Sequence, residues 1–390
     1  MASAINRNND AVATWLFAMC ALVALMIVVG GATRLTDSGL SIVEWRPVTG
    51  AIPPLSEADW LAEFEKYKTI PEYHQVNLGM SLSEFKRIYW WEWGHRFLGR
   101  GIGAAFSIPL VFFAVTRRLD RALGIKLCGL FLLGGLQGAL GWWMVSSGLS
   151  ERVDVSQYRL AAHLGLALVL FAAMLWLALD LKAPRARGAR HRLAPFAVGL
   201  LIGVYAQMML GAFVAGLRAG RVYNTWPLMD GRFFPEAYFS GAPGFADLFE
   251  SAAAAQFNHR LGAYLLFAAA LAMMIAARKT RLAGRAQMLF ALVAAQAALG
   301  VWTVVAGTPL ALGLTHQALA ILVLSSAIFL VHGSMTSIEM TPSSSTVAFG
   351  ARGSATAATG SESAPITPFQ GTSLTGAPPS DVTTASAPSR

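Results

Sequence analysis

Residues 137–145 read Gln-Gly-Ala-Leu-Gly-Trp-Trp-Met-Val, and residues 296–304 read Gln-Ala-Ala-Leu-Gly-Val-Trp-Thr-Val. Six of the nine positions are identical without a gap. The surrounding sequence repeats as well, because His95-Arg96 and His259-Arg260 are each followed closely by Leu-Gly. Such an internal repeat predicts two similar structural halves.

The composition is that of a membrane protein. Of the 390 residues, 55% are hydrophobic and only 13% are charged, whereas soluble domains carry about 25% charged residues. Apolar runs recur along the chain that are long enough to cross a bilayer, which takes about 20 residues. We therefore predict an all-α integral membrane protein with eight transmembrane helices, arranged as two pseudo-symmetric four-helix bundles. The predicted spans are 12–33, 93–115, 124–146, 158–180, 193–216, 256–277, 286–306 and 312–333.

Lys and Arg cluster in three short loops and are scarce in the short loops on the opposite side of the predicted bundle, 147–157 and 307–312. The clustered residues are Arg117, Arg118, Arg121, Lys126, Lys182, Arg185, Arg187, Arg190, Arg192, Arg278, Lys279, Arg281 and Arg285. The positive-inside rule then predicts that both termini are cytoplasmic, so the net charge of +9 reflects topology and not nucleic-acid binding. Because each half has four spans, both halves share one orientation, as in a parallel repeat about the membrane normal.

The chain divides into four predicted segments. Residues 1–11 form a cytoplasmic N-terminus, and residues 12–182 form an N-terminal half. Its long outer loop, 34–92, mixes charged and apolar residues, which predicts a short amphipathic helix at the outer surface. Residues 183–333 form the C-terminal half. Residues 334–390 are rich in Ser, Thr, Ala, Pro and Gly, which predicts a disordered cytoplasmic tail.

Four histidines begin the even-numbered spans, two in each half: His95, His163, His259 and His316. Even-numbered spans start at the outer face, so all four imidazoles are expected at one depth. A single histidine in a span is often a satisfied interior group, but four at one depth favour function. Two facing histidines can hold a haem iron between them. A proton relay and a zinc site are the alternatives, although no Cys or carboxylate repeats at that depth to complete a zinc site.

Two further features accompany the histidine pairs. Arg96 and Arg260 follow their histidines at the membrane surface, where each could pair with a haem propionate or extend to the aqueous interface. Glu92 precedes His95 by three residues, and Gln256 holds the equivalent place before His259. A carboxylate can transfer protons and an amide cannot, so the N-terminal half is the candidate catalytic half. A solvated interfacial carboxylate is the alternative for Glu92.

Three stretches closely resemble the haem A synthase family, and more specifically its proteobacterial and mitochondrial branch. They are Gly30-Gly-Ala-Thr-Arg-Leu-Thr-Asp-Ser-Gly-Leu-Ser-Ile-Val-Glu-Trp-Arg-Pro47, Trp90-Trp-Glu-Trp-Gly-His-Arg-Phe-Leu-Gly-Arg100 and Gln256-Phe-Asn-His-Arg-Leu-Gly262. The resemblance covers roughly residues 10–333 and excludes the tail. The Gram-positive branch carries a cysteine pair in its first outer loop, whereas residues 41–49 here contain none.

The resemblance implies an activity and a role for each histidine. It implies oxidation of the C8 methyl group of haem O to the formyl group of haem A, by successive hydroxylations, for cytochrome c oxidase assembly. His259 and His316 would be the axial ligands of a haem b iron, with Arg260 beside them. His95 and His163 would flank the substrate haem, with Arg96 beside them and Glu92 as the catalytic carboxylate.

The resemblance also implies a place in the cell and partners. The expected location is the bacterial inner (plasma) membrane, as a multi-pass protein surrounded by lipid. Haem O is the expected substrate. Haem O synthase, an electron donor and a second copy of the chain are further candidate partners, and nucleic acid is not one.

Two other function classes compete with this interpretation. A di-haem cytochrome b-type electron carrier would also use two histidine pairs, but it usually stacks its haems at different depths. A transporter would fit the parallel repeat, yet it predicts helices broken by Gly or Pro near mid-membrane. Apart from Pro109 in the second predicted span, such breaks are scarce.

Overall fold

In the computed structural model, the described part of the chain comprises residues 2–150, 152–182, 190–239, 241 and 243–335, and it is almost entirely helical. Eight of its helices are long and apolar enough to cross a membrane, as the sequence predicts. They are α1 (Ala2–Leu35), α4 (Leu82–Val115), α5 (Arg121–Ser146), α6 (Gln157–Lys182), α7 (Ala194–Gly216), α9 (Ala252–Ala277), α10 (Ala283–Val305) and α11 (Leu310–Met335).

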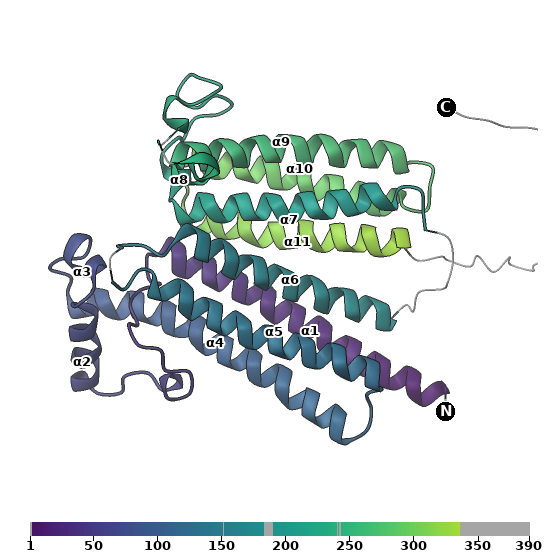
Figure 1. The fold of residues 1–390 in the computed structure, drawn as a ribbon, viewed down its shortest axis with the longest axis horizontal. Helices are drawn as coiled ribbons and strands as arrows, with labels where there is room; N and C mark the ends of the chain where they lie inside the picture. The colour runs from purple at the N-terminus through teal and green to yellow at the C-terminus, as the bar shows by residue number, and fades with distance from the viewer. Residues whose placement is uncertain (1, 151, 183–189, 240, 242, 336–390) are drawn as a thin grey trace, which may run out of the picture. The chain divides into compact units, whose positions relative to one another are not determined.

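The eight helices form two groups of four, which Figure 1 shows as α1, α4, α5 and α6 below and α7, α9, α10 and α11 above. In each group every helix contacts the next in chain order, and the last contacts the first. Contacts between the groups come mainly from α1 and α6 on one side and α7 and α11 on the other. The connectivity of the two groups is therefore the same, as expected for duplicated halves, while their relation by a common axis stays a prediction.

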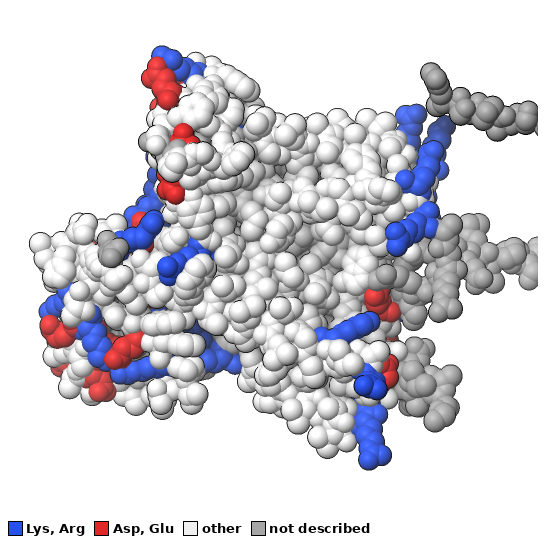
Figure 2. Space-filling view, in the orientation of Figure 1, with Lys and Arg blue, Asp and Glu red and all other residues white. Residues whose placement is uncertain are grey.

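On the face that Figure 2 shows, charged residues gather at the two ends of the helices. Figure 2 shows a broad uncharged belt between a largely basic end, where α9 ends, and a mixed acidic and basic end that carries α2 (Glu57–Tyr67) and α3 (Pro71–Gln75). Such a belt is what contact with lipid acyl chains requires, because a charged side chain in the hydrocarbon region costs several kcal/mol.

Helix α4 extends well beyond its predicted span. It begins at Leu82 and not near residue 93, because Ser81 and Glu84 form a capping box that satisfies the first backbone N–H groups. Residues 82–92 contain Glu84, Lys86 and Arg87, so their hydropathy does not match that of a membrane segment. His95 therefore lies thirteen residues after Leu82, whereas the other three histidines lie within two turns of their helix starts.

The outer loop of the N-terminal half folds into a packed cap. The predicted amphipathic helix is confirmed as α2, which begins at a second capping box and buries Trp60, Phe64 and Tyr67. These aromatics join a small apolar cluster with Phe85 and Tyr89 of α4, so the apolar face of α2 packs on protein. The cap therefore covers the end of the N-terminal half at which α4 begins.

The ends of the described helices differ from the predicted segments in two places. Helix α1 begins at Ala2, so most of residues 1–11 belong to the first helix. Helix α11 continues to Met335, past residue 333. The rest of the predicted tail, residues 336–390, lies outside the described residues.

Candidate functional site

A cavity of about 1520 Å³ extends among the helices of both halves, and all four predicted histidines line it. Its volume exceeds the range of 300–1,000 Å³ that is usual for a site holding one drug-sized ligand. One continuous space therefore connects the two histidine pairs.

The C-terminal pair has the spacing of two ligands on one metal. The ring centroids of His259 on α9 and His316 on α11 are 6.5 Å apart, with an angle of 74° between the rings. Two metal–nitrogen bonds of about 2.0 Å, together with the distance from each nitrogen to its ring centre, amount to roughly 6 Å. The two imidazoles therefore fit opposite axial positions of a haem iron.

Each histidine lies against a glycine of the neighbouring helix. A Cβ added at Gly141 would lie 3.0 Å from Cε1 of His163, and one at Gly211 would lie 3.3 Å from Cε1 of His259. At Gly300 the distance to Cε1 of His316 would be 2.9 Å, and at Gly30 the distance to Nε2 of His95 would be 3.2 Å. A Cβ at any of these positions would crowd the ring and require the imidazole to shift, because Cβ contacts closer than 3.4 Å are uncommon. The four sites share this construction.

Three of the histidines each contact a glutamine of their own, and the sequence analysis did not identify these glutamines. Nε2 of Gln137 lies 3.2 Å from Nδ1 of His163, and Nε2 of Gln207 lies 3.1 Å from Nδ1 of His259. Nε2 of Gln296 lies 3.2 Å from Nε2 of His316. The signal was present, because Gln137 and Gln296 open the repeated stretch and each precedes its glycine by four residues. On a helix that spacing brings both residues to one face.

Glu92 is buried, and both of its carboxylate oxygens accept hydrogen bonds. Its carboxylate accepts hydrogen bonds from Ser41 Oγ (2.8 Å), from the backbone N–H of Ile42 (2.8 Å), and from Nε (3.0 Å) and Nη2 (2.6 Å) of Arg96. Arg96 also donates to the carbonyl oxygens of Ile42 and Glu44. Glu92 and Arg96 both line the cavity, and together they fix residues 41–44 against α4.

The equivalent place in the C-terminal half has free hydrogen-bonding capacity. Gln256 and Arg260 both donate to the carbonyl oxygen of Tyr223, at 2.9 and 3.2 Å. Oε1 of Gln256 and Nη1 of Arg260 are buried without a partner among the described residues. A buried guanidinium nitrogen without an acceptor is costly, and an anion in the cavity would satisfy it. The prediction that Arg260 pairs with a haem propionate is therefore consistent with its surroundings.

In the N-terminal half the comparable cationic group belongs to Arg100. Its Nε and Nη2 donate to the carbonyl oxygens of Pro47 and Arg46, at 2.8 and 2.6 Å. Nη1 is buried with no partner in the described part of the chain, and the residue lines the cavity. The sequence analysis selected Arg96 because it adjoins His95, but Arg100 lies one turn further along the same face and has the unsatisfied donor.

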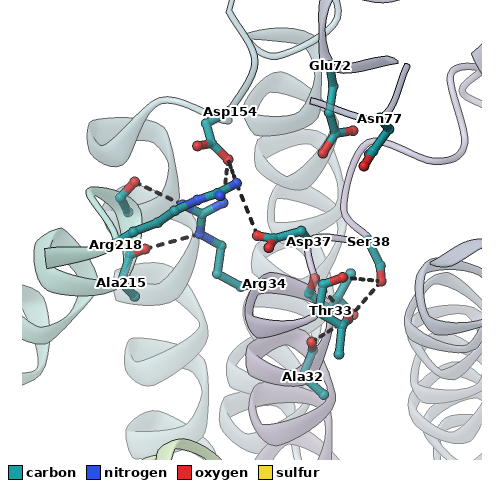
Figure 3. A network of polar contacts seen from close by, with 12 residues as sticks. Ala32, Thr33, Arg34, Asp37, Ser38, Glu72, Asn77, Asp154, Ala215 and Arg218 are labelled. Carbon is teal, nitrogen blue, oxygen red and sulfur yellow. Dashed lines mark hydrogen bonds and ion pairs between the residues drawn. The ribbon is translucent and has the colours of Figure 1, made fainter. Parts of the chain in front are cut away.

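A network of charged residues joins the two halves at the end where α1 and α7 terminate (Figure 3). Asp154, between α5 and α6, accepts from Nη1 of Arg34 at 2.6 Å and from Nη2 of Arg218 at 2.9 Å. Arg34 ends α1 and Arg218 follows α7. Arg218 also pairs with Asp37 at 3.1 Å, and Arg34 donates to the carbonyl oxygens at the end of α7.

Glu72 of α3 lies near this network and lines the cavity (Figure 3). Only 3% of it is exposed, and the hydroxyl of Tyr67 donates to it at 3.2 Å. Burial, with a smaller contribution from the negative charges of Asp154 and Asp37, raises the pKa of the Glu72 carboxyl to about 8. Glu72 is therefore mostly protonated at neutral pH.

Comparison with known proteins supplies the remaining evidence. Residues 13–328 match the family described as "Cytochrome oxidase assembly protein". The chain is 54% identical over 327 residues to the "Heme A synthase" of Parvibaculum lavamentivorans, covering 84% of this chain and 95% of that protein. It is 55% identical over 337 residues to the "Heme A synthase" of Azorhizobium caulinodans, with the same two shares, and 52% identical over 323 residues to that of Caulobacter vibrioides, covering 81% and 94%.

The chain belongs to the haem A synthase family. The resemblance drawn from three short stretches is thereby confirmed over nearly the whole described region, and the chain is an oxidoreductase of cytochrome oxidase assembly. A haem A synthase with eight candidate spans is a multi-pass membrane protein.

Proposed function

We propose that the N-terminal half oxidises the C8 methyl group of haem O to the formyl group of haem A, by successive hydroxylations, while the C-terminal half retains a haem b. His95 and His163 would flank the substrate iron, and His259 and His316 would hold the iron of haem b. The observation that supports this most is the 6.5 Å separation of the His259 and His316 rings within a cavity that also contains the other pair.

The residues around the pairs are suited to two different tasks. In the C-terminal half, Arg260 offers an unpartnered donor to an anion, and Gln256 can only position. In the N-terminal half, Arg100 offers the donor, and the carboxylate of Glu92 lies three residues before His95. A carboxylate can accept or return a proton during oxidation at the adjacent substrate, which an amide cannot do. The bound haem b would supply one-electron redox chemistry.

We also propose that both termini face the cytoplasm, so that the four histidines lie toward the outer leaflet. The basic loops Arg117–Arg121 and Arg278–Arg285 lie at the same end of the helices as the start of α1. The excess of Lys and Arg marks that end as the cytoplasmic one. Reporter fusions at residue 335 and at the loop 307–309 test this, and activity of a cytoplasmic reporter at the loop would contradict it.

The activity is tested by expressing the protein with a source of haem O and separating the extracted haems by chromatography. The expected result is haem A together with its hydroxylated intermediate, and haem b that remains with the purified protein. A preparation that retains two equally stable haems of type b and converts no haem O would instead indicate a di-haem electron carrier.

A further inference from the structure

The helices that face the four histidines carry one recurring pattern, with one exception. Helices α5, α7 and α10 read Gln-x-x-x-Gly at residues 137–141, 207–211 and 296–300. Helix α1 reads Met-x-x-x-Gly at residues 26–30. The glycine of each pattern is the one that lies against a histidine ring. Met26 therefore occupies the position that glutamine occupies in the other three.

The three glutamines bind their histidines in the same two-point manner. Besides lying 3.1–3.2 Å from a ring nitrogen, each Nε2 donates to the backbone carbonyl oxygen of the same histidine. The distances to that oxygen are 3.0 Å for Gln137, 2.8 Å for Gln207 and 2.9 Å for Gln296. One amide thus contacts both the ring and the main chain of its histidine, which fixes the orientation of the ring.

The amide oxygen of each glutamine is the group that a ligating histidine needs. An imidazole that binds iron through one nitrogen carries a proton on the other, and that N–H requires an acceptor. Oε1 of Gln137, Gln207 and Gln296 is buried and has no hydrogen-bond partner among the described residues. Turning the amide so that Oε1 faces the ring lets the oxygen accept the imidazole N–H, in exchange for the bond from Nε2 to the backbone carbonyl oxygen. The amide thus holds the main chain when the facing ring nitrogen carries no proton, and it holds the ring N–H when the imidazole binds iron.

His95 has no such acceptor. Met26 is nearly as long as glutamine, and its Cε lies 3.4 Å from where a Cβ on Gly99 would be. A thioether sulfur accepts hydrogen bonds only weakly. The nearby carboxylate of Glu92 is engaged by Ser41, Ile42 and Arg96. Within the described residues, the structure shows no hydrogen bond to the His95 ring.

We propose that Gln137, Gln207 and Gln296 are positioning residues that make their histidines strong iron ligands, and that Met26 leaves His95 as the weak ligand through which the N-terminal site exchanges its haem. This rests on the proposed placement of haem between each histidine pair. A hydrogen bond to the distal N–H orients the ring and makes it a more basic ligand. A resident cofactor benefits from two such ligands. A site that must take up haem O and release haem A in every cycle benefits from having one that detaches readily.

The exchange of glutamine and methionine tests this in both directions. In the purified holoprotein, Gln207→Met should accelerate the loss of haem b to excess apomyoglobin by roughly 10–100-fold, the usual effect of losing such a partner. Its haem b should also show a raised midpoint potential, because a less basic ligand stabilises the ferric state less. Met26→Gln should slow the loss of haem A, which its formyl absorption distinguishes from haem b, by roughly 10-fold.

A matched control is Gln157→Met. Gln157 is also buried and on a long helix, but its amide donates to Glu250 and contacts no imidazole. This variant should leave both rates of haem loss unchanged. If Gln207→Met cannot be purified folded, Gln207→Glu keeps the shape and strengthens the acceptor, and it should lower the midpoint potential of haem b.

The outcomes separate this inference from the proposed function. A purified protein that carries no haem, or whose haem b survives His259→Ala, overturns the histidine assignment itself. If His259→Ala removes haem b while Gln207→Met and Met26→Gln leave both rates of haem loss at their original values, only the role of the glutamines is wrong. An equal acceleration by Gln157→Met would likewise overturn it.

Discussion

Nη1 of Arg34 lies 2.6 Å from Oδ1 of Asp154, and the same oxygen accepts from Arg218 of the other half at 2.9 Å. One carboxylate oxygen thus joins the end of α1 to the residue that follows α7. The side chains of Arg34 and Asp154 are only 13% and 26% exposed, so solvent screens this contact less than a surface ion pair.

Asp154→Asn should therefore destabilise the junction between the halves. Both arginines lose their charged partner, and we expect a loss of roughly 1–2 kcal/mol in the free energy of unfolding. Thermal unfolding in detergent measures this as a lowered Tm. The control is Asp37→Asn, which removes one partner of Arg218 and none of Arg34. An equally large fall in Tm for Asp37→Asn would show that Asp154 has no special place in the network.

Glu92→Gln should retain haem b and lose most conversion of haem O. The amide fills the same space but cannot take up a proton, so a loss of 10²–10⁴-fold is expected if the carboxylate transfers protons. Haem extraction measures the conversion, and the visible spectrum measures haem b. Normal turnover would refute the catalytic role.

The contacts of Glu92 require a second variant, because the carboxylate also holds residues 41–44. Ser41→Ala removes one of its hydrogen bonds and keeps its charge. We expect Ser41→Ala to retain most of the activity. A loss as large as that of Glu92→Gln would mean that Glu92 acts by anchoring the loop.

His259→Ala should abolish haem b binding, because one axial ligand is lost and the remaining imidazole has no partner across the iron. The absorption bands of haem b should be absent from the purified variant. His74→Ala is the matched control, since His74 lies exposed on α3 outside the cavity. An unchanged spectrum for His259→Ala would exclude this residue as a ligand.

Stability should fall at alkaline pH, and Glu72 should be one cause. Its pKa is raised by burial to about 8 in the folded protein, from about 4.5 in the unfolded chain. The protonated carboxyl is therefore favoured by the fold, so its contribution to stability is complete below about pH 4.5 and is lost as pH rises through about 8. Glu72→Gln mimics the protonated form.

Between pH 6.5 and 9.5 the Tm of the original protein should fall by roughly 2–5 °C more than that of Glu72→Gln. Thermal melts in matched buffers measure the difference. If Tm falls with pH equally in the two proteins, ionisation of Glu72 does not reduce the stability of the fold.

Hydropathy predicted the eight long helices, and the internal repeat singled out the four histidines that line one cavity, because both are strong signals in membrane proteins. The roles of these histidines stay a prediction. The sequence did not predict the start of α4 at Leu82, since a capping box and packing against α2 sustain a helix whose hydropathy is low. The glutamines could not be paired with their histidines from the sequence, because each contact joins two different helices and depends on how they pack. The choice between Arg96 and Arg100 could not be made from spacing, because it depends on which guanidinium the loop 41–47 engages.

The interface between the two halves, which we call the seam, has charged contacts at both of its ends. At one end is the Arg34–Asp154–Arg218 network. At the opposite ends of α6 and α11, Nε2 of His332 lies 3.0 Å from Oδ1 of Asp180. Helices α4 and α5, by contrast, pack mainly within their own half. Movement at this seam would break these ion pairs, whereas displacement of α4 and α5 would leave them intact. We therefore infer that a bulky planar molecule enters sideways from the lipid by displacing the rim that α4 and α5 form. His95 belongs to α4 and would therefore move with that rim. The movement that admits the substrate would then also bring His95, the proposed weak ligand, to the substrate iron.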